Sequence, residues 1–355
     1  MEKLKVGVIF GGVSSEHNVS KVSGTSVISN LNKEKYEILP IYINKEGNWY
    51  TYEKDINEIK ILDIDSNIEN DIKPLSNIVD TLKSLDAVFP VLHGLGGEDG
   101  SIQGLFELLN IPYVGCGILA SSIGMDKAYT KIIFEKAGIK QAKYEYIRKF
   151  NDKYIYVDKN FNEAILNIDE IVSKIDKNLT YPMFIKPSNS GSSVGINKAH
   201  SINELKAAIE YAARFDKKIL IEEGLIGKEV ECSVLGNEEV IASCVGEIKS
   251  AEDFYTFDAK YKNQKSKVLI PAELPEEMSE KIRNLAVKAF KAIDGKGLSR
   301  VDFFANVETN EIYINEINTL PGFTTISMYP KLFEKVGVRY TELLDKLIQL
   351  ALENK

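Results

Sequence analysis

Residues 313–327 read Tyr-Ile-Asn-Glu-Ile-Asn-Thr-Leu-Pro-Gly-Phe-Thr-Thr-Ile-Ser, and residues 299–304 upstream read Ser-Arg-Val-Asp-Phe-Phe. Both segments are rich in β-branched and aromatic residues, which favour strands. Residues 308–310, Glu-Thr-Asn, are typical of a turn between two strands. The two segments therefore predict a β-hairpin that organises the C-terminal part of the chain.

The hairpin also predicts which side chains lie together, because strand side chains alternate between the two faces of a sheet. If the chain folds back about Thr309, Asp302 lies opposite Glu316 and Arg300 lies opposite Asn318. All four polar side chains then share one face. Their carboxylate and amide oxygens suit a hard cation such as Mg²⁺.

Two interpretations of this face stay open at this point. It could be an ordinary solvated sheet face, or it could be a cation site. We expect the apolar residues Phe304, Ile312 and Ile314 to continue the face as a floor. That floor, and the Leu-Pro-Gly break at residues 320–322, favour a site.

The composition bounds the class of protein. A chain of 355 residues predicts two or three domains. With 44% hydrophobic and 27% charged residues it is typical of a globular protein. A net charge of −8 and a pI near 5.3 argue against a nucleic-acid-binding or membrane-surface protein.

The cysteines and the N-terminus indicate a compartment. Three cysteines without a CxxC pair predict a reducing environment rather than a disulfide framework or a zinc site. The first residues carry too many charges for a signal peptide, and the apolar run among them is too short. No run approaches the roughly 20 apolar residues that span a bilayer. We therefore expect a cytoplasmic protein.

The N-terminal part predicts an α/β domain over residues 1–124. An apolar strand at residues 5–12 ends in Gly-Gly and leads into a helix, so the helix N-terminus could receive an anion. Glu16 at this helix entrance could hold a substrate ammonium, or could serve only the helix dipole. Further strands are expected at residues 36–43, 85–92 and 111–117. His93 lies in the loop after the strand at residues 85–92. For a lone loop histidine, a structural role is a simpler interpretation than a functional one.

A second unit begins near Met125-Asp-Lys127. An apolar strand delivers Lys186, and residues 188–195 form a loop of small residues whose backbone N–H groups could bind phosphate. The loop lacks the G-K-[ST] of a Walker A motif. With Lys127 nearby, the pattern favours a nucleotide clamp over a simple turn.

Three later features are less specific. Strands around residues 218–225 and 229–235 carry Glu222 and Glu229, which could face the adenine and ribose of a nucleotide or could simply be exposed. Residues 254–267 are aromatic and basic, typical of a mobile lid but equally of a surface loop. We place domain boundaries after residues 124 and 224, which leaves a third unit over residues 225–355.

Seven segments together resemble the D-alanine–D-alanine ligases, a family of ATP-grasp enzymes. Each segment is weak alone, but all seven occur in the family's order across nearly the whole chain. They are residues 11–20, 93–104, 125–127, 186–195, 260–261, 299–302 and 315–327. The resemblance implies a mixed α/β (α+β) fold with an N-terminal parallel α/β domain and ATP clamped between two C-terminal α+β subdomains.

The resemblance also implies the reaction: ATP-dependent ligation of two D-alanine molecules through an acyl phosphate, for peptidoglycan precursor synthesis. The cofactor is implied to be two Mg²⁺ ions, with Mn²⁺ as a substitute, held by Asp302, Glu316 and Asn318. The implied partners are D-alanine and ATP, with no nucleic acid or membrane, in a homodimer formed through the N-terminal domain. The residues implied to contact ATP are Lys127, Lys186, Ser193, Glu222, Glu223, Leu225, Glu229 and Lys260.

The family's substrate residues are carried over in the same way. Glu16, Ser192 and Tyr261 are implied to form a hydrogen-bonded triad that closes the lid, with Glu16 on the first ammonium. Arg300 and the N–H of Gly322 are implied to form the oxyanion site. The remaining substrate contacts are implied for His93, Ser327 and Met328, with Ser327 receiving the second carboxylate.

Small departures from the family and two other hypotheses remain. Asn18 stands where the family often has Glu, and Thr256 and Phe257 stand where Asp and Tyr are common. These departures bear on the lid and on the second substrate, since relatives that use D-serine or D-lactate share most of the motifs. A nucleotide-binding module without turnover is an alternative. An oxidoreductase depends on Gly11 and Gly12 alone, because G-x-G-x-x-G is absent.

Overall fold

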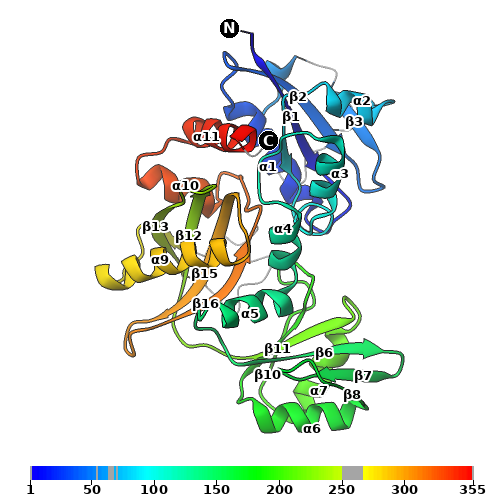
Figure 1. The fold of residues 1–355 in the computed structure, drawn as a ribbon, viewed down its shortest axis with the longest axis vertical. Coiled ribbons are helices and arrows are strands. Elements are labelled where there is room, and N and C mark those ends of the chain that lie inside the picture. Colours follow the sequence, from blue (N-terminus) through cyan, green and yellow to red (C-terminus); the bar gives the residue numbers. More distant parts are fainter. Residues whose placement is uncertain (1, 53–54, 63–67, 69–70, 250–266, 354–355) are drawn as a thin grey trace.

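A computed structural model describes residues 2–52, 55–62, 68, 71–249 and 267–353. Three β-sheets follow one another along the chain, each with helices against it (Figure 1). Within these residues, no helix combines the length and the apolar character needed to cross a membrane. Residues from the parts of the chain that carry the three sheets come together around one cavity.

The first sheet has the strand order β4-β3-β2-β1-β5. Its centre is parallel, as expected, because β1 pairs in parallel with both β2 and β5. Two antiparallel strands, β3 and β4, extend one edge, so the sheet is mixed rather than wholly parallel. The strands are β1 (Leu4–Gly11), β2 (Tyr36–Ile43), β3 (Trp49–Tyr52), β4 (Ile72–Pro74) and β5 (Ala87–Val91).

The strand expected at residues 111–117 is wrong. Only an isolated bridge forms there, between Val88 and Tyr113. Pro112 has no N–H to donate to a ladder, and Gly115 adopts a φ of +121°, which breaks the extended backbone. The helices of this part are α1 (His17–Asn30), η1 (Ile56–Glu58), α2 (Ile78–Lys83), α3 (Ser101–Leu109) and α4 (Ile118–Met125).

The C-terminal helix returns to this first sheet. Leu343 and Leu347 of α11 (Tyr340–Glu353) are buried in one apolar cluster with Val6, Phe10 and Phe89 from β1 and β5. Figure 1 shows α11 lying against the N-terminal part of the molecule. The two ends of the chain therefore share a hydrophobic core.

The second sheet is antiparallel, with the order β10-β9-β11-β6-β7-β8. Helices α6 (Ile168–Asn178) and α7 (Ile202–Ala212) bury their apolar faces against it. Asn167 begins α6 with a capping box that it forms with Glu170. The strands are β6 (Tyr144–Phe150), β7 (Lys153–Val157), β8 (Glu163–Leu166), β9 (Met183–Pro187), β10 (Asn197–Ala199) and β11 (Lys218–Glu223).

The third sheet is also antiparallel, with the order β14-β13-β12-β15-β16. Helix α9 (Glu276–Ala292) covers one face and shares a core with it. Helix α5 (Lys127–Lys136) runs between this sheet and the second one (Figure 1). The other elements are β12 (Lys228–Gly236), β13 (Ile241–Lys249), β14 (Lys267–Leu269), β15 (Gly297–Asn306), β16 (Glu311–Asn318) and α10 (Met328–Lys335).

The predicted hairpin is confirmed, because Asp302 pairs with Glu316 and Arg300 pairs with Asn318. Its expected apolar floor is largely wrong. A β-bulge between Asp302 and Phe303 shifts the register by one residue at Asn315 of β16.

The shift has a direct effect on which side chains face the core. Past the bulge, Ile312 and Ile314 turn to the opposite face and join the buried cluster under α9 with Phe303. Of the three apolar residues expected on the polar face, only Phe304 lies there. Asn315 gains that face and lies beside Glu316.

The contact between α1 and β1 generates a stability prediction. A Cβ added at Gly24 would lie 2.5 Å from Phe10 Cγ, so Gly24→Ala must push the helix away from the strand. We expect a loss of about 1–3 kcal/mol in the free energy of unfolding, measured by urea denaturation. Gly104→Ala in α3 is the matched control, since nothing lies within 4 Å of its added Cβ. Equal stabilities of the two variants would contradict the packing argument.

Candidate active site

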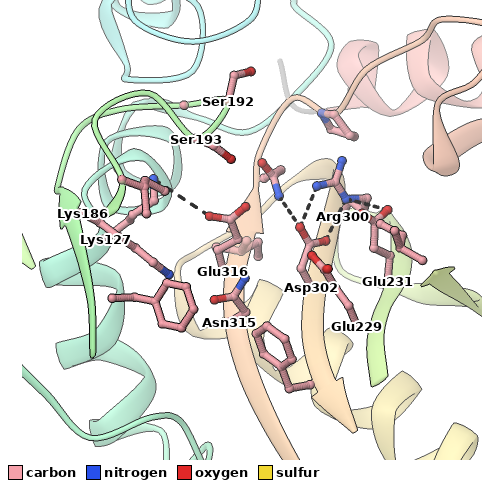
Figure 2. Close-up of a pocket in the computed structure, with 18 of the residues that line it drawn as sticks. Lys127, Lys186, Ser192, Ser193, Glu229, Glu231, Arg300, Asp302, Asn315 and Glu316 are labelled. Carbon is pink, nitrogen blue, oxygen red and sulfur yellow. Dashed lines mark hydrogen bonds and ion pairs between the residues drawn. The ribbon is translucent and has the colours of Figure 1, made fainter. Parts of the chain in front are cut away.

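A large cavity, of about 780 Å³, opens where the three sheets meet. Its walls come from the small-residue loop after β9, from α5, from the polar face of β12, β15 and β16, and from the loop after β16 (Figure 2). The volume is in the range of pockets that hold small ligands or cofactors. The cavity is therefore the candidate active site.

Every site residue expected from the sequence that lies within the described ranges lines this cavity. Lys260 and Tyr261, with the neighbouring Thr256 and Phe257, lie outside the described residues. The residues brought together are Glu16, His93, Lys127, Lys186, Ser192, Ser193, Glu222, Glu223, Leu225, Glu229, Arg300, Asp302, Glu316, Asn318, Gly322, Ser327 and Met328.

Two lysines reach the cavity from elements that are locked to each other. Asp126 caps α5, and its carboxylate also accepts a hydrogen bond from Ser188 Oγ at 2.7 Å. The N–H of Lys127 donates to the Ser188 carbonyl at 3.1 Å, so the loop after β9 is fastened to the start of α5. Lys127 Nζ donates to the Ser190 carbonyl at 2.6 Å and lies 4.0 Å from Glu316.

Glu222 holds a buried cluster of charge at one end of the cavity. Its carboxylate pairs with Lys186 and lies 2.9 Å from Lys131 Nζ. Burial alone would raise the pKa of the Glu222 carboxyl, but the two lysines outweigh burial and lower the pKa to about 2. Glu222 is thus ionised at neutral pH and orients both cations.

Arg300 lies at the centre of the polar sheet face. Its Nε donates to Asp302 Oδ1 at 2.8 Å and its Nη2 to Asp302 Oδ2 at 2.6 Å, which is a bidentate pair. Glu231 Oε2 lies 3.0 Å from the same Nε. Burial would lower the pKa of the Arg300 guanidinium, but Asp302 and Glu231 raise it well above its ordinary value. Asn318 Nδ2 donates to Asp302 Oδ2 at 3.1 Å.

This sheet face carries an excess of negative charge. Four carboxylates, those of Glu229, Glu231, Asp302 and Glu316, line the cavity from three adjacent strands that contribute one arginine. Among the described residues no group of three or more His, Cys, Asp and Glu has the geometry to hold a metal ion by itself. Two carboxylates and an amide instead fit a hard cation whose remaining ligands come from a bound anion.

The loop after β9 also meets the N-terminal part of the chain. Ser192 Oγ donates a hydrogen bond to Glu16 Oε1 across the cavity. Ser192 and Ser193 adopt φ values of +49° and +60°. A Cβ on Gly191 would lie 2.8 Å from Glu16 Oε1, so a larger residue there would displace the carboxylate. Two members of the expected triad therefore meet, and the third lies outside the described residues.

The loop after β16 forms the opposite rim. Ser327 Oγ accepts a hydrogen bond from the N–H of Thr324 at 3.0 Å, and Ser327 stands at the N-terminus of α10. A Cβ on Gly322 would lie 2.7 Å from Ser327 Oγ. The absence of a side chain at Gly322 thus leaves room for the Ser327 hydroxyl at this rim of the cavity.

His93 joins this rim to the first sheet. Burial lowers the pKa of its imidazole, so the ring is neutral at pH 7. Its Nδ1 lies 3.2 Å from the Leu320 carbonyl and must donate, and its Nε2 then accepts from Ser23 Oγ at 2.9 Å. Both ring nitrogens are therefore occupied by the protein, although the ring also lines the cavity.

Sequence reasoning missed Glu98, Glu231 and Asn315, which line the cavity, and Lys131, which pairs with Glu222. Burial and the neighbouring Glu16 carboxylate raise the pKa of Glu98 to about 8, and only its fold neighbours reveal this. Glu231 is two residues from Glu229 on the same strand face, so alternation could have found it. Lys131 lies one helical turn after Lys127, which is also a readable signal. Asn315 depends on the bulge and had no signal.

Lysines from one antiparallel sheet and its helix face carboxylates from a second antiparallel sheet across a single cavity, which is the arrangement of an ATP-grasp enzyme (Figure 2). Two family descriptions match the chain, "D-ala D-ala ligase N-terminus" over residues 5–116 and "D-ala D-ala ligase C-terminus" over residues 133–349. The chain belongs to the D-alanine–D-alanine ligase family.

Relatives and solved structures agree with this assignment. The D-alanine–D-alanine ligase of Acetivibrio thermocellus is 52% identical, over 99% of this chain and 96% of the relative. The D-Ala:D-Ser ligase VanG of Enterococcus faecalis superposes with a TM-score of 0.84 at 38% identity, over 99% and 100% of the two chains. A Bacillus anthracis D-alanine–D-alanine ligase solved in complex with ATP superposes at 0.74, with 29% identity over 99% and 98%.

The Glu222 cluster generates a pH prediction. The folded-state pKa lies below the unfolded value of about 4.3, so this carboxylate contributes stability above pH 4.3 that is lost as the pH falls toward about 2. Glu222→Gln should cost about 3 kcal/mol at pH 7, because it leaves Lys131 and Lys186 buried without a counter-charge. The difference from the parent should shrink below pH 4. Urea denaturation at pH 7 and pH 3.5 measures both values.

An exposed pair serves as the control for that measurement. Glu311→Gln breaks the ion pair with Lys140 at the surface, which should leave the free energy of unfolding close to the parent value at either pH, because exposed ion pairs contribute little. A Glu222→Gln variant that was as stable as Glu311→Gln at pH 7 would contradict the charge assignment.

Proposed function

We propose that this chain joins two D-alanine molecules into D-alanyl-D-alanine, with conversion of ATP to ADP and phosphate. The product would serve peptidoglycan precursor synthesis. The observation that carries the proposal is the convergence of Lys127, Lys186, Asp302, Glu316 and Arg300 on one cavity in a member of this ligase family. A carboxylate is a poor electrophile, and phosphorylation by ATP converts it into a reactive acyl phosphate.

Lys127 and Lys186 are proposed to bind the ATP phosphates, assisted by Ser193 in the small-residue loop. The start of α5 supports this role, because a helix N-terminus favours an anion. The other end of the cavity would hold the nucleoside. The residues proposed there are Glu222 and Glu229 through their carboxylates and Glu223 and Leu225 through their backbone. The side chain of Glu223 accepts from the N–H of Thr180 at 2.9 Å, and its own N–H donates to the Lys143 carbonyl at 3.0 Å.

Asp302, Glu316 and Asn318 are proposed to hold two Mg²⁺ ions, or Mn²⁺ in their place. The excess of carboxylates on this sheet face supports the assignment. When bound, the cations would neutralise the charge that builds up on the transferred phosphoryl group. Lys260, outside the described residues, is proposed to reach the same phosphate.

Glu16 is proposed to bind the ammonium of the first D-alanine. The hydrogen bond that Ser192 donates to Glu16 supports this role. It joins the carboxylate proposed to hold the substrate ammonium to the loop proposed to bind phosphate. Tyr261, outside the described residues, would complete the triad and close the lid over the cavity. His93 and Met328 would form walls of the substrate pocket.

Attack of the second amine on the acyl phosphate builds an oxyanion. Arg300 and the N–H of Gly322 are proposed to stabilise it, and the exclusion of water would protect the acyl phosphate from hydrolysis. Ser327 is proposed to receive the carboxylate of the second D-alanine. Its place at the N-terminus of α10 supports this, because the helix N–H groups there favour a carboxylate.

We also propose the domain boundaries and a location. Breaks after residues 124 and 224 keep each sheet in its own unit, with α11 packed back onto the first unit. Cys116, Cys232 and Cys244 are free thiols in the structure, which fits a reducing compartment that also supplies ATP. The cytoplasm is the proposed location.

A coupled assay of ADP release tests the function. D-alanine and Mg²⁺ together should stimulate ADP release, and L-alanine should not replace D-alanine. ATP binding without turnover for any amino acid would contradict the proposal and favour a binding module. The likeness to a D-Ala:D-Ser ligase makes D-serine an informative second substrate, with D-lactate alongside it.

Arg300→Ala should lower kcat by about 100-fold to 1,000-fold, because the oxyanion loses its charged donor. Arg339→Ala, at an exposed position remote from the cavity, is the matched control and should keep the parent rate. An Arg300→Ala variant with the parent kcat would remove the oxyanion role.

A homodimer is proposed through the N-terminal domain. Exposed apolar side chains support it, since Leu108 of α3 is 87% exposed and Ile118 and Leu119 of α4 lie on the neighbouring helix. Leu108→Glu should shift the protein from dimer to monomer in light scattering, while Ile226→Glu, at an equally exposed apolar position in another unit, should not. A dimer that survives Leu108→Glu would contradict this interface.

A further inference from the structure

The guanidinium of Arg300 is shared by two buried carboxylates from different strands. Asp302 takes both Nε and Nη2 in the bidentate pair, and Glu231 Oε2 lies 3.0 Å from Nε. Glu231 of β12 pairs with Asp302 of β15 in the sheet register, so the two carboxylates stand side by side. Figure 2 shows Arg300 between them, on the face that lines the cavity.

The two carboxylates differ in what else they serve. Asp302 is also a proposed ligand of the divalent cations, and its two oxygens are both occupied by Arg300 here. A cation that binds Asp302 through the lone pairs facing Arg300 therefore displaces the guanidinium from them. Glu231 is 5% exposed and stays within reach of Nε when that happens.

Displacement without a second partner would be costly. The Arg300 side chain is 17% exposed, and a buried charge without a counter-charge is strongly destabilising. A guanidinium freed from Asp302 could also leave the position where the oxyanion forms. We propose, on the basis of the function proposed above, that Glu231 is a positioning residue that holds Arg300 in the cavity when a divalent cation takes Asp302.

This exchange links two parts of the site. The Nη2 group of Arg300 becomes available for the substrate as the cation replaces it on Asp302, while Glu231 keeps Nε. The anionic-substrate site is then completed by the cation that accompanies ATP. Glu231 acts through Arg300 and touches no reacting atom.

A double-mutant cycle tests the positioning role. Glu231→Gln should lower kcat about tenfold in the parent, with the KM for ATP unchanged, because Arg300 loses a charged partner. In an Arg300→Lys background the same change should lower kcat less than about twofold, since lysine has no Nε to hold. Equal losses in the two backgrounds would overturn the proposal.

Two variants guard against a purely structural explanation. Glu247→Gln removes another buried carboxylate of the same sheet, which pairs with Lys228 at 2.9 Å, and should leave kcat within about twofold of the parent. If Glu231→Gln does not fold, Glu231→Asp keeps the charge but is one methylene shorter. It should still lower kcat, and a parent-level kcat in Glu231→Asp would contradict the proposal.

Binding of Mn²⁺ alone, followed by electron paramagnetic resonance, tests the exchange without turnover. Arg300→Lys has the same net charge as the parent but cannot form the bidentate pair, so Mn²⁺ should bind about fivefold tighter to it. Equal Mn²⁺ affinities would show that Arg300 does not compete for Asp302. This result stands even if the parent releases no ADP with D-alanine, an outcome that would sink the proposed function instead.

Discussion

The sheet face formed by β12, β15 and β16 carries more negative charge than its single arginine can balance. Glu229, Glu231, Asp302 and Glu316 line one cavity, where Arg300 pairs with two of them, whereas Lys228 at the start of β12 pairs with Glu247. Closely spaced carboxylates repel one another unless cations lie between them. The lysines of α5 and β9 across the cavity, and the cations and nucleotide that we propose, all follow from that imbalance.

The lysines on the other side of the cavity are held in place by a few hydrogen bonds between the start of α5 and the loop after β9. One serine, Ser188, links the capping carboxylate of Asp126 to the backbone of α5 through its hydroxyl and carbonyl. A helix start and a loop that come from distant parts of the chain therefore present their N–H groups and lysines to the same space. Such a rigid frame suits phosphoryl transfer, where positioning and electrostatics supply most of the catalysis.

Much of this site could be predicted because its information is local. The turn at residues 308–310 and strand alternation fixed the pairing of Asp302 with Glu316, and motif order brought distant segments together. The bulge at Asn315 could not be predicted, since it depends on how two strands twist against each other. The partnership of Glu231 with Arg300 needed the β12–β15 register, which no single segment encodes. The strand expected at residues 111–117 does not form, because Pro112 and Gly115 break the ladder despite the apolar residues around them.

The return of α11 to the first sheet has a consequence for how this protein is made. Val6 and Phe10 emerge from the ribosome long before Leu343 and Leu347, which share their core. The nascent N-terminal sheet must therefore wait with part of its apolar surface uncovered, and such surface is prone to aggregation. The first sheet therefore completes its apolar core only when the fourteen-residue helix α11 has been synthesised and packs against it.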